Sequence, residues 1–266
     1  MTVIESRQNG TLRHLSRLAR EKKYRVACGE MLCEGEKMLY EALSSGVSVR
    51  TVLLHEDADS LARGLALQAE AAGAKLFSAP GALLRQASDV ETPQGVVFSC
   101  APPVFGEGVI AGASRVLLLD GLQDPGNMGT ILRTADAFAL DAVVLCEGCT
   151  DPYAPKVVRA TMGAIFRLPT LRLPRAAAFA ACRAAGLPVY AAALAEGSLP
   201  VQQAALSRCA VAIGNEGRGV SAETLAACDQ KIIIPMDGRA ESLNAGVAAA
   251  ILMWEMARKN ARNDIT

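Results

Sequence analysis

The sequence predicts an α/β fold in two parts, a small N-terminal α/β domain followed by a larger α/β domain around a parallel sheet. Short, continuous apolar segments of strand length alternate with segments of helical spacing, a pattern typical of parallel sheets covered by helices on both faces. A Pro- and Gly-rich stretch, residues 101–114, interrupts the alternation and indicates a linker. We therefore predict a first domain over residues 1–100 and a second over 115–266.

The first domain contains three segments with strand character and one with helical spacing. The strands are expected at 49–57, 74–79 and 95–100, and the helix at 58–73. In the second domain the alternation begins again with "RVLLLD", residues 115–120. Further strands are expected at 142–147, 188–194, 210–214 and 231–235, and helices at 130–140, from Pro155, at 175–185, at 221–228 and after Asn244.

The composition indicates a globular protein without a large electrostatic bias. The 266 residues are 51% hydrophobic, and 27 Lys plus Arg balance 27 Asp plus Glu. A chain of this length forms a core without disulfides, and its eight cysteines lack the spacing of a secreted framework. The N-terminus has no signal-peptide pattern, and no apolar run reaches the roughly 18 residues that span a bilayer. We therefore expect a cytoplasmic protein without membrane contact.

A metal site is not expected. One CxxC pair, Cys146 and Cys149 in "CEGC", has no second CxxC or paired histidines to complete the four ligands of a zinc site. The histidines, His14 and His55, lie outside the loops that follow the central strands, which disfavours a reaction centred on a histidine base.

Three loops of the second domain contain more polar side chains than turns and helix caps need. They follow the strands that end at Asp120, Gly214 and Pro235, and read "GLQDPGNMGTILRTADAF", "GNEGRGVS" and "MDGRAESLN". Because open α/β sheets bind ligands beyond the carboxyl ends of their strands, we expect these loops to meet at a ligand site. The polar side chains that they bring there are Asn127, Arg133, Glu216, Ser242 and Asn244.

Ser242 and Asn244 stand at the start of the apolar C-terminal helix. One such side chain caps a helix by accepting a hydrogen bond from a free backbone N–H. Capping does not readily account for both, so a binding or catalytic role is the alternative. Asn127 or Thr130 is likewise open to a capping role, and Arg218 to that of a solvated charge.

The glycine spacing of these loops argues against the common nucleotide-binding motifs. Neither G-x-G-x-x-G nor the Walker A pattern is present. Asp141 lies at the distance expected of a ribose-binding acid in a nucleotide-dependent dehydrogenase, but that interpretation requires the missing glycine pattern.

The three loops resemble the signature motifs of the SpoU/TrmH class of SPOUT RNA ribose 2′-O-methyltransferases. "NMGTILRTADAF", "IGNEGRGVS" and "IIIPMDGRAESLNAGVA" occur in the order and at the spacing of that family. "YRVACGEMLCEGEKMLYEAL" and "TPQGVVFSC" are similar to the ribosomal-protein-like substrate-binding domain that often precedes it. The resemblance implies a SPOUT α/β domain with a C-terminal trefoil knot, which no local pattern would predict.

The resemblance also implies S-adenosylmethionine as cofactor, bound in the knot largely by backbone groups. The implied cofactor-binding residues are Leu194, Gly214, Asn215, Gly217, Ile234, Met236, Ser242 and Leu243. The implied catalytic residues are Arg133, Asn127, Glu216, Ser242 and Asn244. The family's arginine is often described as a general base, but a guanidinium stays protonated in proteins. We therefore expect Arg133 to clamp a phosphate and to stabilise the developing 2′-alkoxide.

Two positions depart from the family pattern. Gly246 stands where Ser or another small residue is common, and Ala139 stands where Gly is usual. Neither is one of the implied catalytic side chains, so we expect changes in packing rather than in activity.

Because the net charge is zero, contact with RNA requires a local basic surface. Residues 7–25 contain seven basic side chains against one acid, Glu21. The candidate RNA-binding residues are Arg7, Arg13, Arg17, Lys22, Lys23, Arg25 and Arg218, with Arg20, Lys156, Arg159 and Arg239 as further candidates. An ordinary solvated helix face is the alternative.

The resemblance therefore predicts methyl transfer from S-adenosylmethionine to a ribose 2′-hydroxyl of RNA, a group that DNA lacks. Ribosomal RNA is favoured because of the added N-terminal domain. The alternatives are a tRNA 2′-O-methyltransferase and a non-catalytic RNA-binding or ribosome-assembly factor of the same fold. The resemblance also implies a homodimer, in which Ile251, Leu252 and Trp254 of the last helix are either buried at the interface or part of the core.

Overall fold

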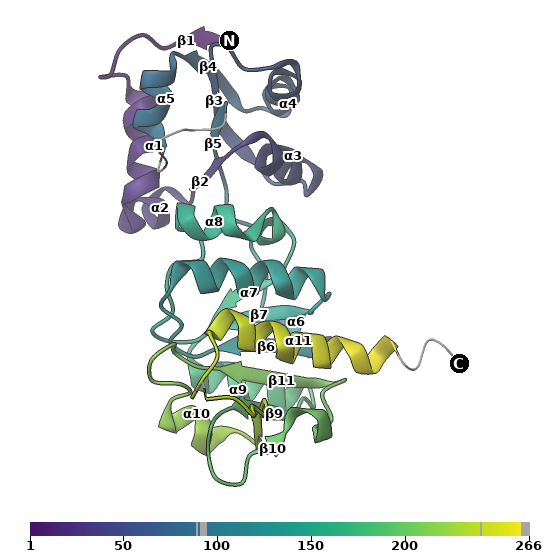
Figure 1. Cartoon of the computed structure of the whole chain (residues 1–266). Helices are drawn as coiled ribbons and strands as arrows, with labels where there is room; N and C mark the ends of the chain where they lie inside the picture. The colour runs from purple at the N-terminus through teal and green to yellow at the C-terminus, as the bar shows by residue number, and fades with distance from the viewer. Residues whose placement is uncertain (89, 91–94, 240, 262–266) are drawn as a thin grey trace. The chain divides into compact units, whose positions relative to one another are not determined.

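The chain folds into two compact units (Figure 1). The computed structural model describes residues 1–88, 90, 95–239 and 241–261. The first unit contains Met1–Val104 and Asp151–Arg167, and the second contains Phe105–Thr150 and Leu168–Thr266. Residues 92–94 of the "TPQGVVFSC" stretch and residue 240 of the third loop lie outside the described residues.

A five-stranded mixed sheet forms the centre of the first unit. In spatial order its strands are β1 (Thr2–Val3), β4 (Lys75–Ala79), β3 (Val49–His55), β5 (Val96–Cys100) and β2 (Met31–Glu34). β5 is antiparallel to both of its neighbours, and the other pairs are parallel. The three strands predicted from the sequence, β3, β4 and β5, are confirmed.

Helices cover both faces of this sheet. They are α1 (Gly10–Arg20), α2 (Lys22–Cys28), α3 (Glu36–Ser44), α4 (Ser60–Ala71), α5 (Gly81–Ala87) and α8 (Pro155–Thr161), with the 3₁₀ turn η1 (Ala164–Phe166). α1 and α5 lie on one side of the strands, and α3 and α4 on the other (Figure 1). α1 buries Leu12, Leu15 and Leu18 in one apolar cluster with Leu53 of β3 and Leu84 of α5. This spacing is that of a helix with one buried face.

The segment Asp151–Arg167 belongs to the first unit although β7 and β8, which flank it in the sequence, belong to the second. Among the residues that the structure describes, ion pairs hold it between Arg25 and Asp151 at 2.7 Å, Arg159 and Glu34 at 3.3 Å, and Arg167 and Glu41 at 2.6 Å. Glu34, from the "CEGEK" stretch, has a side chain that is 4% exposed and also accepts a hydrogen bond from Ser88 at 2.6 Å. Buried charges require such partners, so the segment is fixed to the first unit.

A seven-stranded sheet forms the centre of the second unit, and all of its strand pairs are parallel, as predicted. In spatial order the strands are β10 (Leu199–Pro200), β12 (Gln230–Ile233), β9 (Val189–Ala192), β11 (Cys209–Ile213), β6 (Arg115–Leu119), β7 (Ala142–Leu145) and β8 (Thr170–Arg172). The chain moves outward from β6 to β8 and then returns to build the other half of the sheet. The switch point therefore lies between β6 and β11.

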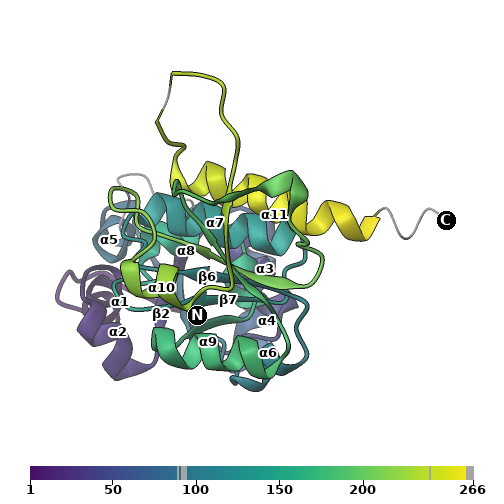
Figure 2. The same cartoon turned by 90° about the horizontal axis from the view of Figure 1, so that it is seen from below.

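Helices also cover both faces of this second sheet. They are α6 (Gly108–Ala111), α7 (Pro125–Ala137), α9 (Arg175–Ala184), α10 (Ala222–Ala227) and α11 (Ala245–Ala261), with the 3₁₀ turn η2 (Val201–Gln203). Figure 2 shows α7 and α11 on one face and α6 and α9 on the other. Val116 and Leu118 of β6 pack in the cluster that contains α6 and α9, so alternate residues of the strand face alternate layers.

Two predicted features differ from the structure. α7 begins at Pro125 rather than at residue 130, because Asp124 caps it and accepts a hydrogen bond from the backbone N–H of Asn127 at 2.7 Å. The predicted linker, residues 101–114, contains the one-turn helix α6, and its Ile110 is fully buried with α9. The prediction that this stretch has no element of its own was therefore wrong, because one apolar turn sufficed to anchor it.

Candidate active site

The carboxyl ends of β6, β9, β11 and β12 meet at one edge of the second sheet. β6 and β11 are neighbours there, and the N–H of Asp120 donates to the carbonyl of Ile213 at 2.8 Å. Open parallel sheets bind ligands at such a switch point. The three polar loops predicted from the sequence leave the sheet at this edge, after β6, β11 and β12.

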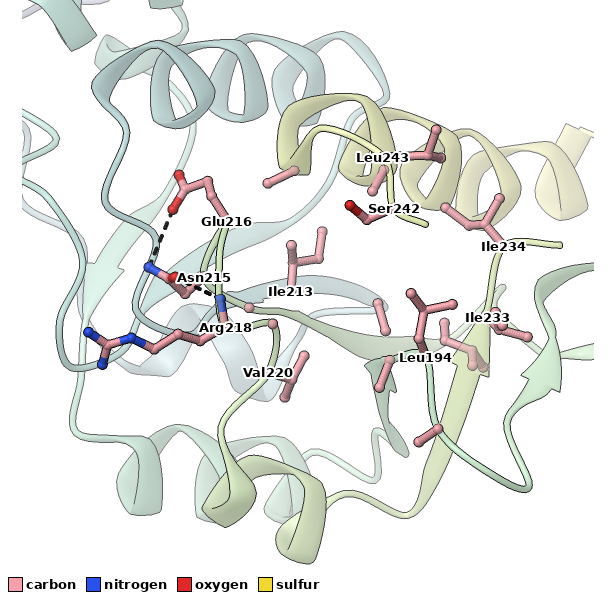
Figure 3. A pocket seen from close by; sticks show the side chains of 18 of the residues that line it. Leu194, Ile213, Asn215, Glu216, Arg218, Val220, Ile233, Ile234, Ser242 and Leu243 are labelled. Atoms are coloured by element: carbon pink, nitrogen blue, oxygen red, sulfur yellow. Dashed lines mark hydrogen bonds between the residues drawn. The ribbon is translucent and has the colours of Figure 1, made fainter. Parts of the chain in front are cut away.

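A cavity of about 420 Å³ opens at this edge (Figure 3). Its walls come from the segments 192–195, 213–220 and 232–234, together with residues from the start of α11 and the turn before it. The cavity contains all eight positions predicted to bind cofactor: Leu194, Gly214, Asn215, Gly217, Ile234, Met236, Ser242 and Leu243. The cavity is also lined by Ile213, Val220 and Leu225. Nothing in the sequence distinguishes these three from other apolar core residues, so only the structure identifies them. A cavity of this size, lined mainly by apolar residues with a few polar side chains, is typical of a small-molecule binding site.

The loop after β11 is a tight hairpin that forms one wall of the cavity. Asn215 and Gly219 exchange two backbone hydrogen bonds of 2.9 Å, and the Asn215 side chain accepts from the N–H of Gly217 at 3.0 Å. A Cβ on Gly214 would collide with the backbone of Gly219 and Val220. No side chain fits there, so Gly214 allows the close approach of the two backbones.

Glu216 joins this hairpin to the loop after β6. Its carboxylate accepts hydrogen bonds from the N–H groups of Gln123 at 3.1 Å and Asp124 at 2.9 Å, and from the Asn127 amide at 3.1 Å. Partial burial opposes ionisation of Glu216, but the bonds from Asn127 and Asp124 outweigh it, so the pKa lies below its ordinary value. Glu216 is therefore an ionised, fully occupied acceptor rather than a free base.

Asn244 extends this network to the third loop. Its amide donates to the Asn127 side chain at 2.9 Å, and its oxygen accepts from the N–H groups of Gly246 at 2.9 Å and Val247 at 3.2 Å at the start of α11. Asn244 is thus both the helix cap and a partner of Asn127. Ser242 lines the cavity and makes no hydrogen bond with the residues that the structure describes, so capping does not explain it.

Arg133 stands apart from this cluster. It lies on α7, is exposed, and is not among the described residues that line the cavity. Thr130, one helical turn earlier, lines a shallow apolar groove between α7 and α11. Residues three apart on a helix share a face, so Arg133 lies beside this groove.

The groove between α7 and α11 exposes apolar side chains that a monomer would leave in water. It is lined by Thr130, Phe138, Asn244, Gly246, Val247, Ala250, Ile251 and Trp254. Val247 is 49% and Trp254 52% exposed, and the Phe138 and Trp254 rings lie 5.8 Å apart. Leu252, by contrast, is fully buried and belongs to the core.

The basic residues of the N-terminal segment are not equivalent. Arg7, Arg13, Lys22 and Lys23 are exposed. Arg17 is exposed as well, pairs with Glu21 at 2.9 Å and lies 3.8 Å above the Tyr24 ring. Arg25 is 7% exposed, and its guanidinium is bound by Asp151 and the Leu18 carbonyl. A phosphate would have to displace these partners, so Arg25 has a structural role, whereas Arg218 is exposed in the second unit.

Two alternative sites are disfavoured by the structure. Asp141 accepts hydrogen bonds from the N–H groups of Ser114 and Arg115, both at 2.8 Å, at the opposite end of β6 from the cavity. It therefore does not serve as a ribose-binding acid there. Cys146 and Cys149 are buried, and burial raises the pKa of Cys146 to about 12.

Within the described part of the chain, no group of three or more His, Cys, Asp or Glu side chains is arranged to hold a metal. In the same residues, no helix has both the length and the apolar character needed to span a bilayer.

Comparison with known proteins agrees with this geometry. Residues 114–254 match the SpoU rRNA Methylase family, and residues 9–97 match the MRM3-like substrate binding domain. Over 260 residues the chain is 37% identical to the 23S rRNA (guanosine(2553)-2'-O)-methyltransferase RlmP of Bacillus subtilis, covering 96% of this chain and 99% of that protein. It is 30% identical to the 23S rRNA (uridine(2479)-2'-O)-methyltransferase of Streptomyces viridochromogenes, covering 95% and 91% respectively.

Solved structures show the same likeness. The AdoMet-bound rRNA methyltransferase from Sinorhizobium meliloti has a TM-score of 0.88 and 29% identity, covering 97% of this chain and 98% of that one. The SpoU methyltransferase AviRb from Streptomyces viridochromogenes, in complex with AdoMet, has a TM-score of 0.85 and 29% identity, covering 96% and 99%. The fold and site thus define an S-adenosylmethionine-dependent enzyme that methylates RNA on the ribose 2′-oxygen. The chain belongs to the SpoU rRNA methylase family.

Proposed function

We propose that this enzyme methylates one ribose 2′-hydroxyl of ribosomal RNA in the cytoplasm. The observation that supports this choice is the length of the match. The two relatives named as 23S rRNA enzymes share 99% and 91% of their own length with this chain. A solved structure concerned with 2-OH methylation of C/U34 on tRNA, 27% identical with a TM-score of 0.51, covers only 56% of this chain.

The proposed roles of the polar cluster follow from its contacts. Glu216, Asn127 and Asn244 are held by one another and by backbone groups, so they shape the three loops around the substrate ribose. Ser242 lines the cavity, and its hydroxyl, which has no hydrogen-bond partner among the described residues, is available to a ligand there. When bound, S-adenosylmethionine would supply the methyl group and become S-adenosylhomocysteine, while the proton of the ribose 2′-hydroxyl would pass to a water molecule. Arg133, as a fixed cation, clamps a phosphate and stabilises negative charge on the 2′-oxygen, while positioning supplies up to about 7 to 11 kcal/mol of the acceleration.

We also propose that the chain between β12 and α11 forms a trefoil knot. Ile234, Met236, Ser242 and Leu243 line the same cavity as the hairpin after β11, which brings this segment against earlier strands. The wall of the cavity is then a threaded loop.

The test of function is methylation of RNA from a strain that lacks the protein. The purified enzyme is incubated with labelled S-adenosylmethionine and either ribosomal RNA, immature ribosomal subunits or tRNA, and any 2′-O-methyl nucleotide is mapped. We expect incorporation at a single ribose of ribosomal RNA. Incorporation into tRNA alone would identify a tRNA enzyme instead. Cofactor binding without incorporation into any of these would indicate a non-catalytic RNA-binding or assembly factor.

A second copy of the chain is the proposed occupant of the groove between α7 and α11. The groove exposes Val247 and Trp254 beside the site, and Arg133 lies next to it but outside the cavity of its own chain. A symmetric dimer would cover the apolar side chains and bring Arg133 of one copy to the cavity of the other. The active site would then be complete only in the dimer.

Mixing two inactive variants tests this arrangement. Arg133→Ala removes the arginine, and Gly214→Ala closes the cofactor hairpin by the clash described above. If the arginine acts across the interface, a randomly exchanged mixture regains about a quarter of wild-type activity, since half of the dimers have one complete site. If it acts within its own chain, the mixture stays inactive. A monomer by analytical ultracentrifugation would overturn the dimer itself.

The exposed basic residues of α1, α2 and the residues before them form the proposed RNA surface of the first unit. They are Arg7, Arg13, Arg17, Arg20, Lys22 and Lys23. Arg218, exposed in the second unit, is a separate RNA-binding candidate. The variant Lys22→Glu/Lys23→Glu is expected to raise the KM for RNA about tenfold and to reduce the salt slope of binding by about 2. The matched control is Arg50→Glu/Lys75→Glu, which changes the same charge on exposed positions of β3 and β4. Equal effects of the two variants would point to total charge rather than to this surface.

A further inference from the structure

Asp120 lies one residue beyond β6, at the sheet edge where the cavity opens. It is not among the described residues that line the cavity, and its side chain is 4% exposed. Removing a carboxylate from water is costly unless the carboxylate is paired and hydrogen-bonded. Such a buried carboxylate therefore holds its hydrogen-bond partners in fixed positions.

Both carboxylate oxygens of Asp120 have partners. One accepts hydrogen bonds from the backbone N–H and the hydroxyl of Ser221, at 2.9 and 2.6 Å. The other pairs with the Arg175 guanidinium at 2.9 Å. Arg175 begins α9 and Ser221 caps α10, so one side chain connects the end of β6 to two helices.

Ser221 directly follows the hairpin that forms one wall of the cavity. Gly219 and Val220, the two residues before it, line the cavity themselves. Near its start the hairpin is fixed by the Asn215 side chain, which donates to the Gly121 carbonyl at 2.9 Å, and by Glu216. Asp120 fixes the other end, where the hairpin turns into α10.

We propose that Asp120 is a positioning residue, which holds the segment 214–220 in the conformation that binds S-adenosylmethionine through its two hydrogen bonds to Ser221. Because the Asp120 side chain is buried and does not line the cavity, its proposed role requires no contact with cofactor or RNA. Loss of these bonds therefore raises the Kd and KM for the cofactor, lowers kcat much less once the cofactor saturates, and leaves the KM for RNA unchanged. A residue that served stability alone would not raise the Kd and KM for the cofactor while changing kcat much less and leaving the KM for RNA unchanged.

The chain offers a matched control. Asp141, at the opposite end of β6, also accepts two backbone hydrogen bonds, both of 2.8 Å, but lies far from the hairpin. We would measure binding of S-adenosylhomocysteine by calorimetry, unfolding midpoints and steady-state methylation for Asp120→Asn, Ser221→Ala and Asp141→Asn. Because the titration involves no RNA, its result is independent of which RNA is methylated.

Loss of hydrogen bonds to a charged group predicts a Kd about tenfold higher or more in Asp120→Asn and about threefold higher or more in Ser221→Ala. Asp141→Asn should lower the unfolding midpoint and keep the Kd within about twofold of wild type. Ser221→Thr keeps the hydroxyl and should restore the affinity that Ser221→Ala loses.

Wild-type Kd values in both Asp120→Asn and Ser221→Ala would overturn the proposal. So would an equal loss of affinity in Asp141→Asn, because the effect would then come from general destabilisation. If Asp120→Asn fails to fold, Ser221→Ala decides the question, since it keeps the ion pair of Asp120 with Arg175.

Discussion

At the scale of single residues, Ala139 adopts a left-handed backbone conformation, with a φ of 51°, just after α7. The N–H of Leu140 donates to the Ala135 carbonyl at 2.9 Å, and that of Ala139 to the Asp136 carbonyl at 3.0 Å. These two bonds define a Schellman motif, whose left-handed position favours glycine. Ala139, which stands where the family usually has Gly, is therefore a point of backbone strain.

Ala139→Gly is expected to stabilise the protein by about 0.5 to 1 kcal/mol, because relief of the left-handed strain exceeds the added freedom of the unfolded chain. The measurement is the urea midpoint at constant m-value. Ala137→Gly is the control, since Ala137 is exposed and belongs to the same helix in right-handed conformation. That change should cost about 0.5 to 1 kcal/mol, and shifts of the same sign in both variants would contradict the argument.

At the scale of elements, Glu216 is the side chain that ties the hairpin after β11 to the start of α7. Burial alone would raise its pKa, but its hydrogen bonds lower the pKa in the folded state. A lowered folded-state pKa stabilises the protein above the unfolded pKa of about 4.3, and this stabilisation disappears as the pH falls through the folded value.

Glu216→Gln is therefore expected to destabilise by about 1 kcal/mol at pH 7, because at least one backbone N–H loses a charged acceptor. The difference in unfolding free energy between Glu216→Gln and wild type should be constant above about pH 5 and shrink as the pH falls below about 4. Urea midpoints from pH 7 to pH 3 measure it. Glu223→Gln, whose side chain is 72% exposed and 3.9 Å from Arg175, should show no comparable trend. A wild-type advantage that grew on acidification would contradict the assignment.

The sequence predicted the elements whose pattern is local. β3, β6, β7 and β12 are apolar runs between polar turns, and each was predicted to within a few residues. The two-residue strands β1 and β10 have no such pattern, and α6 is a single turn inside Pro- and Gly-rich sequence. The sequence analysis considered a helix near α1 only as a solvated face, whereas Leu12, Leu15 and Leu18 have helical spacing and are buried.

The site was predictable as a set of residues but not as a network. The motifs identified Asn127, Glu216 and Asn244, yet their hydrogen bonds join positions 89 and 117 residues apart, which no spacing rule gives. In the sequence, Asp120 could be interpreted only as the last residue of a strand. The fold is needed to show that Ser221 lies against it. Burial likewise separated Arg25 from its exposed basic neighbours.

At the scale of the whole molecule, the chain leaves the second unit after β7, contributes Asp151–Arg167 to the first unit and returns at β8. The Arg25–Asp151 pair, with side chains 7% and 14% exposed, is the most buried of the three ion pairs that hold this segment. Removing one partner of a buried pair leaves an uncompensated charge.

Asp151→Ala is therefore expected to cost about 3 to 5 kcal/mol of unfolding free energy. The control is Glu21→Ala, which breaks the pair with Arg17, where both side chains are about half exposed at 52% and 47%. Because solvent screens an exposed pair, its loss should lower the unfolding free energy much less than loss of the Arg25–Asp151 pair. Denaturant unfolding of both variants makes the comparison, and equal costs would mean that burial does not set the strength of the Arg25 pair.

Because Asp151–Arg167 belongs to the first unit, the order of synthesis affects how the first unit folds. A nascent polypeptide that ends at Val104 lacks α8, so the first unit cannot be completed until Arg167 has been added, 63 residues later. At about 5 to 20 residues per second this delay is about 3 to 13 s, during which β6, α7 and β7 are also synthesised. The first unit is therefore expected to finish folding only after part of the second unit has been synthesised, so that the folding of the two units overlaps in time.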